Sequence, residues 1–460
     1  MTDQDQGPGR RQDGRDDGHP DRDQDRPDAE VAPRLGAREI DRLLAGVEAA
    51  DDTYHRAWPE PPHTRQPVQV LYVPADRVRA STANDHGAEA LRLLHAHAPD
   101  VGSFADATGI ADVFLADEVR ARVVTRLVTG PVDDLRVDFE DGYLGRSSDD
   151  EARDAVAAAR AVARAVEVGE APPFVGLRVK SFTDGLARRS VATLDRFVGT
   201  LLDRLGHLPD GFVVTFPKIV AVDHVRAFVE VLGSLEAAHG LPEGRLRFEV
   251  QIETTPSVLG PDGTIALRAI RDAGAGRIVA AHLGVYDYTA GLGLPPGEQR
   301  LEHPACDFVR HLLLVTFAGT EVRLSDGSSN AVPARDTAAE LHRVWSTHAA
   351  TVRHSLAHGY VQGWDLHPSQ LVSRYATVYA DLLRGFGDVL DRLHRWYSPS
   401  VAATGTVMDE PATIRRLEAH VQRAVDSGAA TADQVTARTG RPITPRPATL
   451  RAPDPTEDMA

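Results

Sequence analysis

Short apolar runs of β type alternate with helical patterns over most of the chain. This alternation is typical of a parallel sheet with crossover helices. Eight such units predict an α/β fold in which the strands close into a (β/α)8 TIM barrel, with an open doubly wound sheet as the alternative. The candidate strands are PVQVLYVP, DLRVDFED, FVGLRVKS, GFVVTFPK, LRFEVQIET, GRIVAAHLG, TEVRLSDG and GYVQGWDLHP.

Helical patterns fill the intervals between these runs. The clearest are DDEARDAVAAARAVARAV, DHVRAFVEVLGSLEAAHG and PSQLVSRYATVYADLLRGFGDVLDRL, which begin with Asp or Pro as helix N-termini often do. An additional helical pattern at 99–130 separates the first two strands, and a long helix is expected at 335–357 before the eighth. The barrel is therefore expected over 65–398.

Both ends of the chain differ from this pattern. Residues 1–64 are expected to be a disordered or weakly structured extension, because the first 34 contain almost no apolar side chains to bury. Residues 431–460 are expected to be a tail, because the prolines of RPITPRPATLRAPDP cannot continue a helix.

Composition limits the classes of partner. The net charge of -16 argues against nucleic acid or an anionic membrane surface and favours small-molecule ligands. The single cysteine, Cys306, excludes an intramolecular disulfide, and no apolar run is long enough for a signal segment or a membrane span. A cytoplasmic location is the expectation.

Polar side chains gather at the predicted carboxyl ends of the strands, where TIM barrels build their active sites. Burying several charges at one end of a barrel is costly unless they pair, bind a metal or bind substrate. Each of these side chains, taken alone, could instead have a purely structural role. Arg178 could form a salt bridge, for example, and His367 could cap a helix. These side chains are Asp138, Glu140, Asp141, Arg178, Lys180, Lys218, Glu253, Asp287, Asp365 and His367.

Glu253 and Asp287 are the best candidate pair of metal ligands, because they follow adjacent strands and two carboxylates suit Mg2+, or Mn2+. No histidine or cysteine cluster of zinc type is visible. His303 and His367 each precede a proline, and isolated histidines in such positions are more often structural. His367, at the end of the eighth predicted strand, is also a candidate for binding substrate. No phosphate-binding loop, dinucleotide-binding glycine motif or nucleophile elbow is found.

Lysine usage suggests a second chemistry. Only two of the 51 basic residues are lysines, and both Lys180 and Lys218 end predicted strands. Either could bind substrate, or act as the nucleophile of a Schiff-base aldolase if burial kept it unprotonated.

The order of short motifs along the chain resembles the citrate lyase β-subunit-like branch of the HpcH/HpaI aldolase superfamily, with malate synthases and pyruvate-kinase-like barrels as more distant relatives. The resemblance runs from about Val68 to Gly428. It departs from the family at Lys180, where the family has asparagine, and at Gly142, where it has alanine. The motifs are LYVPADR, VDFEDGY, LRVKS, FPKI, QIETTPSVLG, HLGVYDYTAGLG, GWDLHPSQL and GTVMDEPATIRRLEAHV.

The resemblance implies a Mg2+-dependent carbon–carbon lyase or Claisen-type synthase that acts on a keto or hydroxy acid, or on its acyl-CoA thioester, through an enolate. It places Glu253 and Asp287 on the metal, Arg178 on the substrate and the Glu140–Asp141 pair beside the metal. It also implies a lid helix at 399–430 whose Asp409 serves as the base, often in a neighbouring subunit, and hence a homo-oligomer, a dimer or trimer.

Two further readings remain open at this level. A barrel with a charged mouth could bind a metabolite without converting it. By analogy with pyruvate-kinase-like barrels, the chain could instead transfer a phosphoryl group, which would require nucleotide binding.

Overall fold

The computed structural model describes residues 34–57, 65–398, 410–448 and 450. The chain divides into two compact units, Met1–Ala57 and Trp58–Ala460. In the first unit, the described helices α1 (Ala37–Leu44) and α2 (Val47–Ala57) have no buried residue among those whose exposure is described. The second unit holds the predicted barrel.

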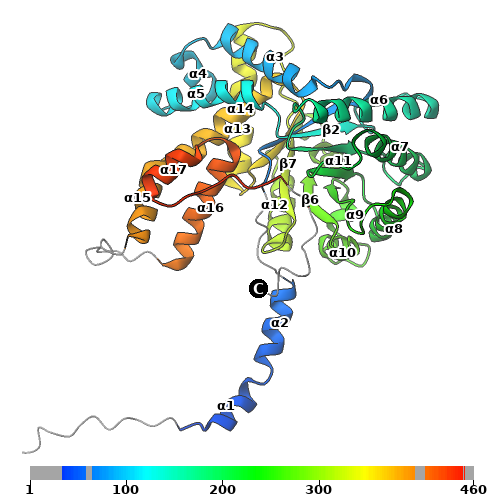
Figure 1. The fold of residues 1–460 in the computed structure, drawn as a ribbon, viewed down its shortest axis with the longest axis vertical. Helices are drawn as coiled ribbons and strands as arrows, with labels where there is room; N and C mark the ends of the chain where they lie inside the picture. The colour runs from blue at the N-terminus through cyan, green and yellow to red at the C-terminus, as the bar shows by residue number, and fades with distance from the viewer. Residues whose placement is uncertain (1–33, 58–64, 399–409, 449, 451–460) are drawn as a thin grey trace, which may run out of the picture. The chain divides into compact units, whose positions relative to one another are not determined.

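Eight parallel strands close into a barrel in the order β1 to β8, with β1 paired to β8 (Figure 1). All eight predicted strands form, so the (β/α)8 fold is confirmed and the open-sheet alternative is wrong. The strands are β1 (Gln69–Pro74), β2 (Asp134–Asp138), β3 (Phe174–Arg178), β4 (Phe212–Phe216), β5 (Phe248–Ile252), β6 (Ile278–Leu283), β7 (Arg323–Ser328) and β8 (Gln362–Asp365).

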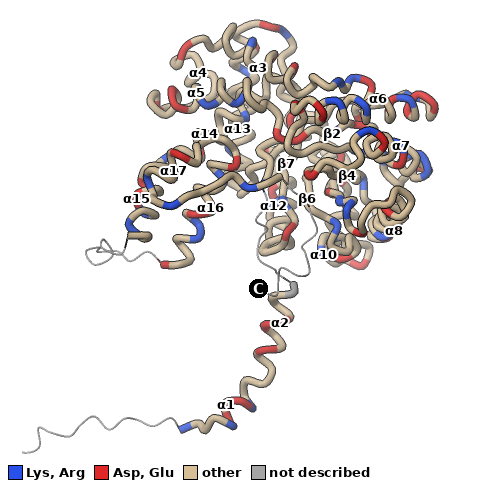
Figure 2. Tube along the Cα trace, in the orientation of Figure 1, with Lys and Arg blue, Asp and Glu red and all other residues tan. Residues whose placement is uncertain are grey.

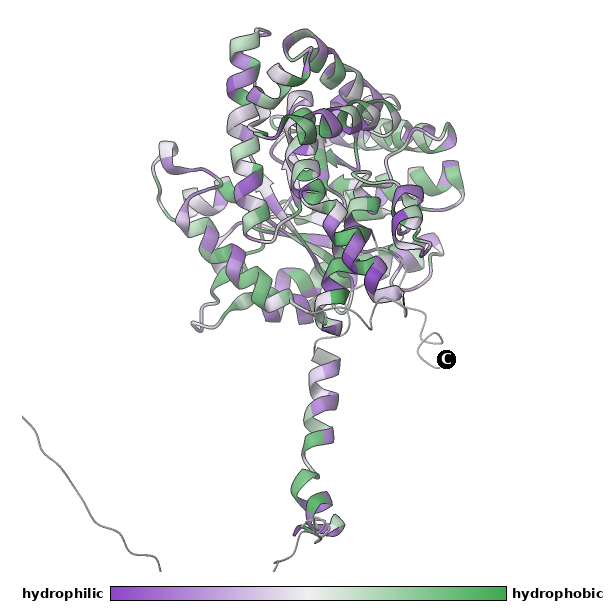
Figure 3. Cartoon of the chain, turned by 90° about the vertical axis from the view of Figure 1, so that its left-hand side faces the viewer, coloured by the Kyte–Doolittle hydropathy of each residue, from purple (hydrophilic) through white to green (hydrophobic). Residues whose placement is uncertain are grey.

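Helices surround the barrel, and green and purple alternate along them in Figure 3, as expected of helices with one buried and one exposed face. They are α3 (Thr82–His97), α4 (Val101–Thr108), α5 (Val113–Thr129), α6 (Ser148–Glu167), α7 (Ala187–Leu205), α8 (Val222–His239), α9 (Thr255–Val258), α10 (Ala266–Ala273), α11 (Val285–Gly291), α12 (Pro304–Phe317), α13 (Ala338–Ala357), α14 (Pro368–Leu383), α15 (Phe386–Tyr397), α16 (Pro411–Ser427) and α17 (Ala432–Thr439). In the described chain, no helix has the length and apolar character needed to cross a membrane.

Two predicted helical regions are divided in the structure. The insert at 99–130 forms α4 and α5, and α4 begins with a capping box between Asp100 and Ser103. The pattern at 368–393 breaks between α14 and α15, where Gly385 adopts a φ of 67°. Glycine tolerates this left-handed conformation at little steric cost, so the chain changes direction there.

The interior of the barrel contains charges where branched apolar side chains are usual. Arg136 is completely buried and bonds to both Asp134 and Glu249. Glu249 also lies 2.9 Å from Nε2 of His282 and accepts a hydrogen bond from Tyr72. In contrast, Figure 2 shows acidic and basic segments alternating along outer helices such as α6 and α7, where water solvates them.

The described part of the C-terminal segment, residues 431–448 and 450, packs against the rest of the second unit instead of extending as a tail. Thr431 caps α17 by accepting a hydrogen bond from the Gln434 N–H, and Gly440 ends the helix with a φ of 75°. Beyond the helix, the Leu450 N–H donates to the carbonyl of Asp210, which lies just before β4. The prolines prevent a helix after Gly440, but they do not prevent an extended segment from packing.

Leu450 closes the amino-terminal end of the barrel. Its side chain is 6% exposed and clusters with Phe174, Val213 and Val279. Leu450→Ala is expected to lower the free energy of unfolding by about 2 kcal/mol, because it opens an apolar gap at a place where the nearby chain end can partly adjust. Urea denaturation measures this. Leu259→Ala, at a side chain that is 56% exposed, is the control and should change stability by less than about 0.5 kcal/mol; equal effects would contradict the packing.

The described part of the predicted lid segment does not contact the carboxyl ends of the strands in its own barrel. Helix α16 lies beside α14 and α15 (Figure 1), and the Tyr379 hydroxyl of α14 donates to the carbonyl of Ser427 at its end. Its buried side chains join the apolar cluster formed by α3, α5, α13, α14 and α15. A lid role for this helix therefore requires another barrel or another position of the helix.

Candidate active site

Four carboxylates converge at the carboxyl ends of β2, β5 and β6, around Lys218. These four residues, Glu140, Asp141, Glu253 and Asp287, are called the acidic cluster below. The Lys218 Nζ lies 2.9 Å from Asp141 and 3.3 Å from Asp287, and it also bonds to Glu140. Nine residues were given a catalytic, substrate-binding or metal-ligating role from sequence, and the structure brings together six of them: the acidic cluster, Lys218 and Arg178.

Arg178 joins the acidic cluster from β3. Its guanidinium donates to both oxygens of Asp138 at 2.7 Å, and Nη1 lies 3.1 Å from Glu140. The rings of Tyr72 and Trp364 each lie 5.1 Å from its guanidinium carbon. These bidentate bonds and ring contacts fix the guanidinium in one orientation, which a substrate-binding arginine requires.

Lys218 occupies a strained position at the end of β4. Its φ of 49° is unusual for a residue other than glycine, and its backbone N–H donates to Glu253 Oε1 at 2.7 Å. The surrounding carboxylates raise the pKa of this lysine against the effect of its burial. Lys218 therefore stays an ammonium ion, which disfavours its role as a Schiff-base nucleophile.

Glu253 is the most deeply buried member of the acidic cluster, with an exposure of 2%. No lysine or arginine forms an ion pair with it within 4.0 Å among the residues that the structure describes. The adjoining loop is built closely around it, because a side chain at Gly284 would meet its carboxylate at 2.4 Å. Burial raises the pKa of Glu253 to about 8, although Lys218 opposes this effect. A divalent cation would stabilise the charged carboxylate.

This pKa makes stability depend on pH. In metal-free protein, folded Glu253 keeps a proton that the unfolded chain releases above about 4.5. The contribution of this group to stability is therefore complete below that pH, and it falls by up to roughly 1.4 kcal/mol per pH unit until the pKa near 8 is reached.

Glu253→Gln should remove this dependence. In EDTA, the stability of the variant relative to wild type should increase between pH 5 and about 8. Urea denaturation at several pH values measures the difference, and a difference that does not change with pH would contradict the assignment.

Two other predicted residues lie apart from the acidic cluster. The Lys180 ammonium bonds to the carbonyl of Phe139 and lies 3.5 Å from Glu151 of α6, which places it between the sheet and the helices. His367 accepts a hydrogen bond from the Ser369 N–H and caps α14, which is the structural reading given above. These contacts do not support a substrate-binding role for Lys180 or for His367. Asp409 lies outside the described residues.

Asp138 and Gly142 belong to the site, but neither was given a role from sequence. Asp138 holds Arg178, and its carboxylate also accepts from the backbone N–H groups of Glu140 and Gly142. A side chain at position 142 would meet that carboxylate at 2.6 Å, which explains the glycine where the resembling family has alanine. The alternation of Asp134, Arg136 and Asp138 on one side of β2 was the available signal.

This geometry matches the way in which TIM barrels place catalytic groups at the carboxyl ends of their strands. In a comparison with protein families, residues 47–446 match the family model described as "Domain of unknown function (DUF6986)". The chain belongs to the DUF6986 family.

Beyond the DUF6986 family, the chain is 38% identical over 97 residues to the L-malyl-CoA/beta-methylmalyl-CoA lyase of Haloarcula marismortui. That match covers 21% of this chain and 26% of the lyase, so it spans about a quarter of that protein.

Two solved structures are similar to this chain. Haloferax volcanii malate synthase, solved as a magnesium/glyoxylate complex, is 17% identical with a TM-score of 0.46, over 81% of this chain and 95% of that one. An HpcH/HpaI aldolase from Desulfitobacterium hafniense is 15% identical with a TM-score of 0.33, over 55% and 83% of the two chains.

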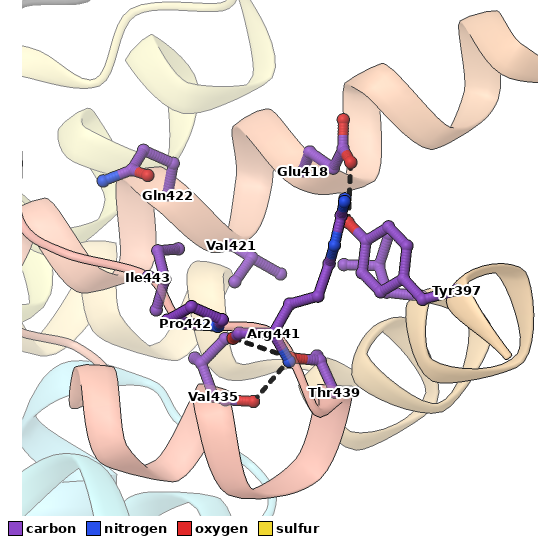
Figure 4. A pocket seen from close by; sticks show the side chains of 10 residues that line it. Tyr397, Glu418, Val421, Gln422, Val435, Thr439, Arg441, Pro442 and Ile443 are labelled. Carbon is purple, nitrogen blue, oxygen red and sulfur yellow. Dashed lines mark hydrogen bonds between the residues drawn. The ribbon is translucent and has the colours of Figure 1, made fainter.

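A separate pocket of this DUF6986 chain lies between α15, α16 and α17 (Figure 4). The Tyr397 hydroxyl donates to Glu418 at 2.6 Å, and the Arg441 guanidinium lies over the Tyr397 ring. Apolar side chains such as Val421 and Ile443 form much of its wall. None of its lining residues belongs to the acidic cluster, so it adds nothing to the candidate site.

Proposed function

We propose that this chain is a Mg2+-dependent enzyme that forms or cleaves a carbon–carbon bond next to a carboxylate or thioester. The observation that carries the proposal is the acidic cluster, with Arg178, at the carboxyl end of a (β/α)8 barrel. The 97-residue similarity to a protein named as an acyl-CoA lyase points to the same class of chemistry.

Glu253 and Asp287 are the proposed metal ligands. All four donors of the acidic cluster are carboxylates, and oxygen ligands are those that Mg2+ and Mn2+ prefer. Glu253 is buried and Asp287 is 43% exposed, so the pair lies at the boundary between the barrel and solvent. Mg2+ held by these two carboxylates would supply the positive charge that favours loss of a proton next to a substrate carbonyl.

Arg178 is the proposed contact for the substrate's carboxylate or developing negative charge. Asp138 holds two of its nitrogens, while Nη1 is directed toward Glu140 and Asp141 at the open end of the site. Lys218 and the Glu140–Asp141 pair lie beside the same space, where they can orient substrate and share protons.

Asp409 remains the proposed base, delivered by the segment before α16. Since α16 lies away from the mouth of its own barrel, delivery from a neighbouring subunit of a dimer or trimer is the arrangement we propose. Asp409→Asn should then lower turnover without lowering the affinity for Mg2+.

Enolate formation can be tested without knowing the second substrate. The protein is incubated in D2O with pyruvate or oxaloacetate and Mg2+, and deuterium at the carbon next to the carbonyl is followed by mass spectrometry. The proposal predicts exchange that requires Mg2+ and stops with EDTA. Ligand-induced stabilisation without exchange or product from any keto acid or acyl-CoA would instead favour a metabolite-binding barrel.

A further inference from the structure

A second group of metal-binding side chains lies between two crossover helices on the outside of the barrel. Asp307 belongs to α12, while His354 and His358 lie four residues apart at the end of α13. One ligand atom from each of the three lies within 4.8 Å of the other two. The sequence showed no zinc-type cluster, because Asp307 is 47 residues from His354 and only the fold brings them together.

The hydrogen bond of His358 fixes which of its nitrogens can bind a metal. Its Nδ1 lies 2.9 Å from the backbone oxygen of His354. A carbonyl oxygen can only accept, so Nδ1 carries the proton and neutral His358 presents a lone pair on Nε2. That Nε2 lies 3.6 Å from Asp307 Oδ1. Two acceptors facing each other at this distance are favourable only when a proton or a cation lies between them.

The carboxylate of Asp307 also has an oxygen that can still coordinate a metal ion. Its Oδ1 accepts from Arg310 at 2.6 Å and lies 2.8 Å from His354 Nε2, whereas Oδ2 has no hydrogen-bond partner within the described ranges. Arg310 is itself held by Asp326 and by the carbonyl of Leu301. Arg310 therefore fixes the orientation of the Asp307 carboxylate, as groups around metal ligands commonly do. Its positive charge also weakens cation binding.

We infer that Asp307, His354 and His358 form a binding site for a first-row transition-metal ion of the zinc class, separate from the acidic cluster. Two imidazoles and one carboxylate suit Zn2+, with water as a fourth ligand, whereas the all-oxygen acidic cluster suits Mg2+. The ligand atoms must lie roughly 3.4 Å from one another for tetrahedral zinc, and side chains about one-quarter exposed can adjust to this spacing by rotation. The ion would fasten the crossover after β6 to that after β7.

The test is isothermal titration of ZnCl2 into the full chain without a histidine tag, in the Glu253→Gln background that disables the acidic cluster. We expect one zinc per chain, not displaced by excess Mg2+. His354→Gln and His358→Gln should each weaken zinc binding at least about tenfold, since removing a ligand should cost no less than removing a supporting contact.

His239→Gln is the matched control, because His239 forms a surface pair with Asp195 at 2.7 Å but has no second histidine beside it; it should leave zinc binding unchanged. Circular dichroism checks that each variant is folded. If a variant unfolds, zinc content of wild-type protein in excess Mg2+ provides the second measurement. Absence of bound zinc, or equal affinity in the folded His354 and His358 variants, would overturn the inference.

Discussion

Glu253→Gln is expected to abolish Mg2+-dependent turnover, lowering the rate at least roughly a hundredfold. The substitution removes an ionisable carboxyl group that has no cationic side chain paired to it within the described chain, but it keeps the size of the side chain and the acceptor for the Lys218 N–H. Deuterium exchange into pyruvate measures the loss of the reaction, and titration with Mg2+ measures the loss of metal affinity.

Glu298→Gln is the control for this variant, because Glu298 is exposed and, among the described residues, forms an ion pair only with Arg300. It should leave exchange and metal affinity unchanged, and the Glu253 variant should remain folded in EDTA. Undiminished exchange in folded Glu253→Gln protein would remove Glu253 from the metal site.

Glu249→Ala is expected to lower the free energy of unfolding by about 3–5 kcal/mol. Glu249 accepts from Arg136 Nε and Nη2 at 3.1 and 3.2 Å, and both side chains are buried in the barrel. Its removal leaves Asp134 as the one carboxylate that the described structure pairs with Arg136, and His282 loses the carboxylate beside it. Urea denaturation at constant pH measures the change.

Two further variants serve as controls for the stability loss expected of Glu249→Ala. Glu249→Gln keeps one acceptor oxygen, which can still accept from the Thr215 hydroxyl and from Arg136 Nε, and it should cost less than the alanine. Asp391→Ala breaks an exposed pair with Arg438 and should cost no more than about 1 kcal/mol. A Glu249→Ala protein as stable as Asp391→Ala would show that the interior charges do not depend on one another.

The alternation of apolar runs was sufficient to predict all eight strands and the barrel, because closure follows from eight parallel units joined by crossovers. The acidic cluster was predictable for a related reason: residues at the carboxyl ends of parallel strands meet at one end of a barrel. Glu253 and Asp287 needed only their places after β5 and β6 to be paired.

Side-chain directions beyond the strand ends were not predictable in the same way. Lys180 and Lys218 have equivalent positions in the sequence pattern, yet Lys218 turns into the acidic cluster through its left-handed backbone while Lys180 turns toward Glu151. Pairing of Asp307 with His354 depends on how two helices pack, which no local pattern encodes. The tail prediction is wrong for the described residues 431–448 and 450, because proline content reports on helices and not on packing.

Thermal unfolding with Mg2+ and pyruvate, added singly and together, tests the central claim most directly, because only ligands that bind the folded state raise its stability. The account predicts a modest stabilisation by Mg2+ alone, none by pyruvate in EDTA, and a stabilisation by both together that exceeds the sum. Oxaloacetate, glyoxylate and acetyl-CoA in place of pyruvate then narrow the substrate class. Stabilisation by a keto acid that is the same in Mg2+ and in EDTA would contradict a metal-dependent site at Glu253 and Asp287.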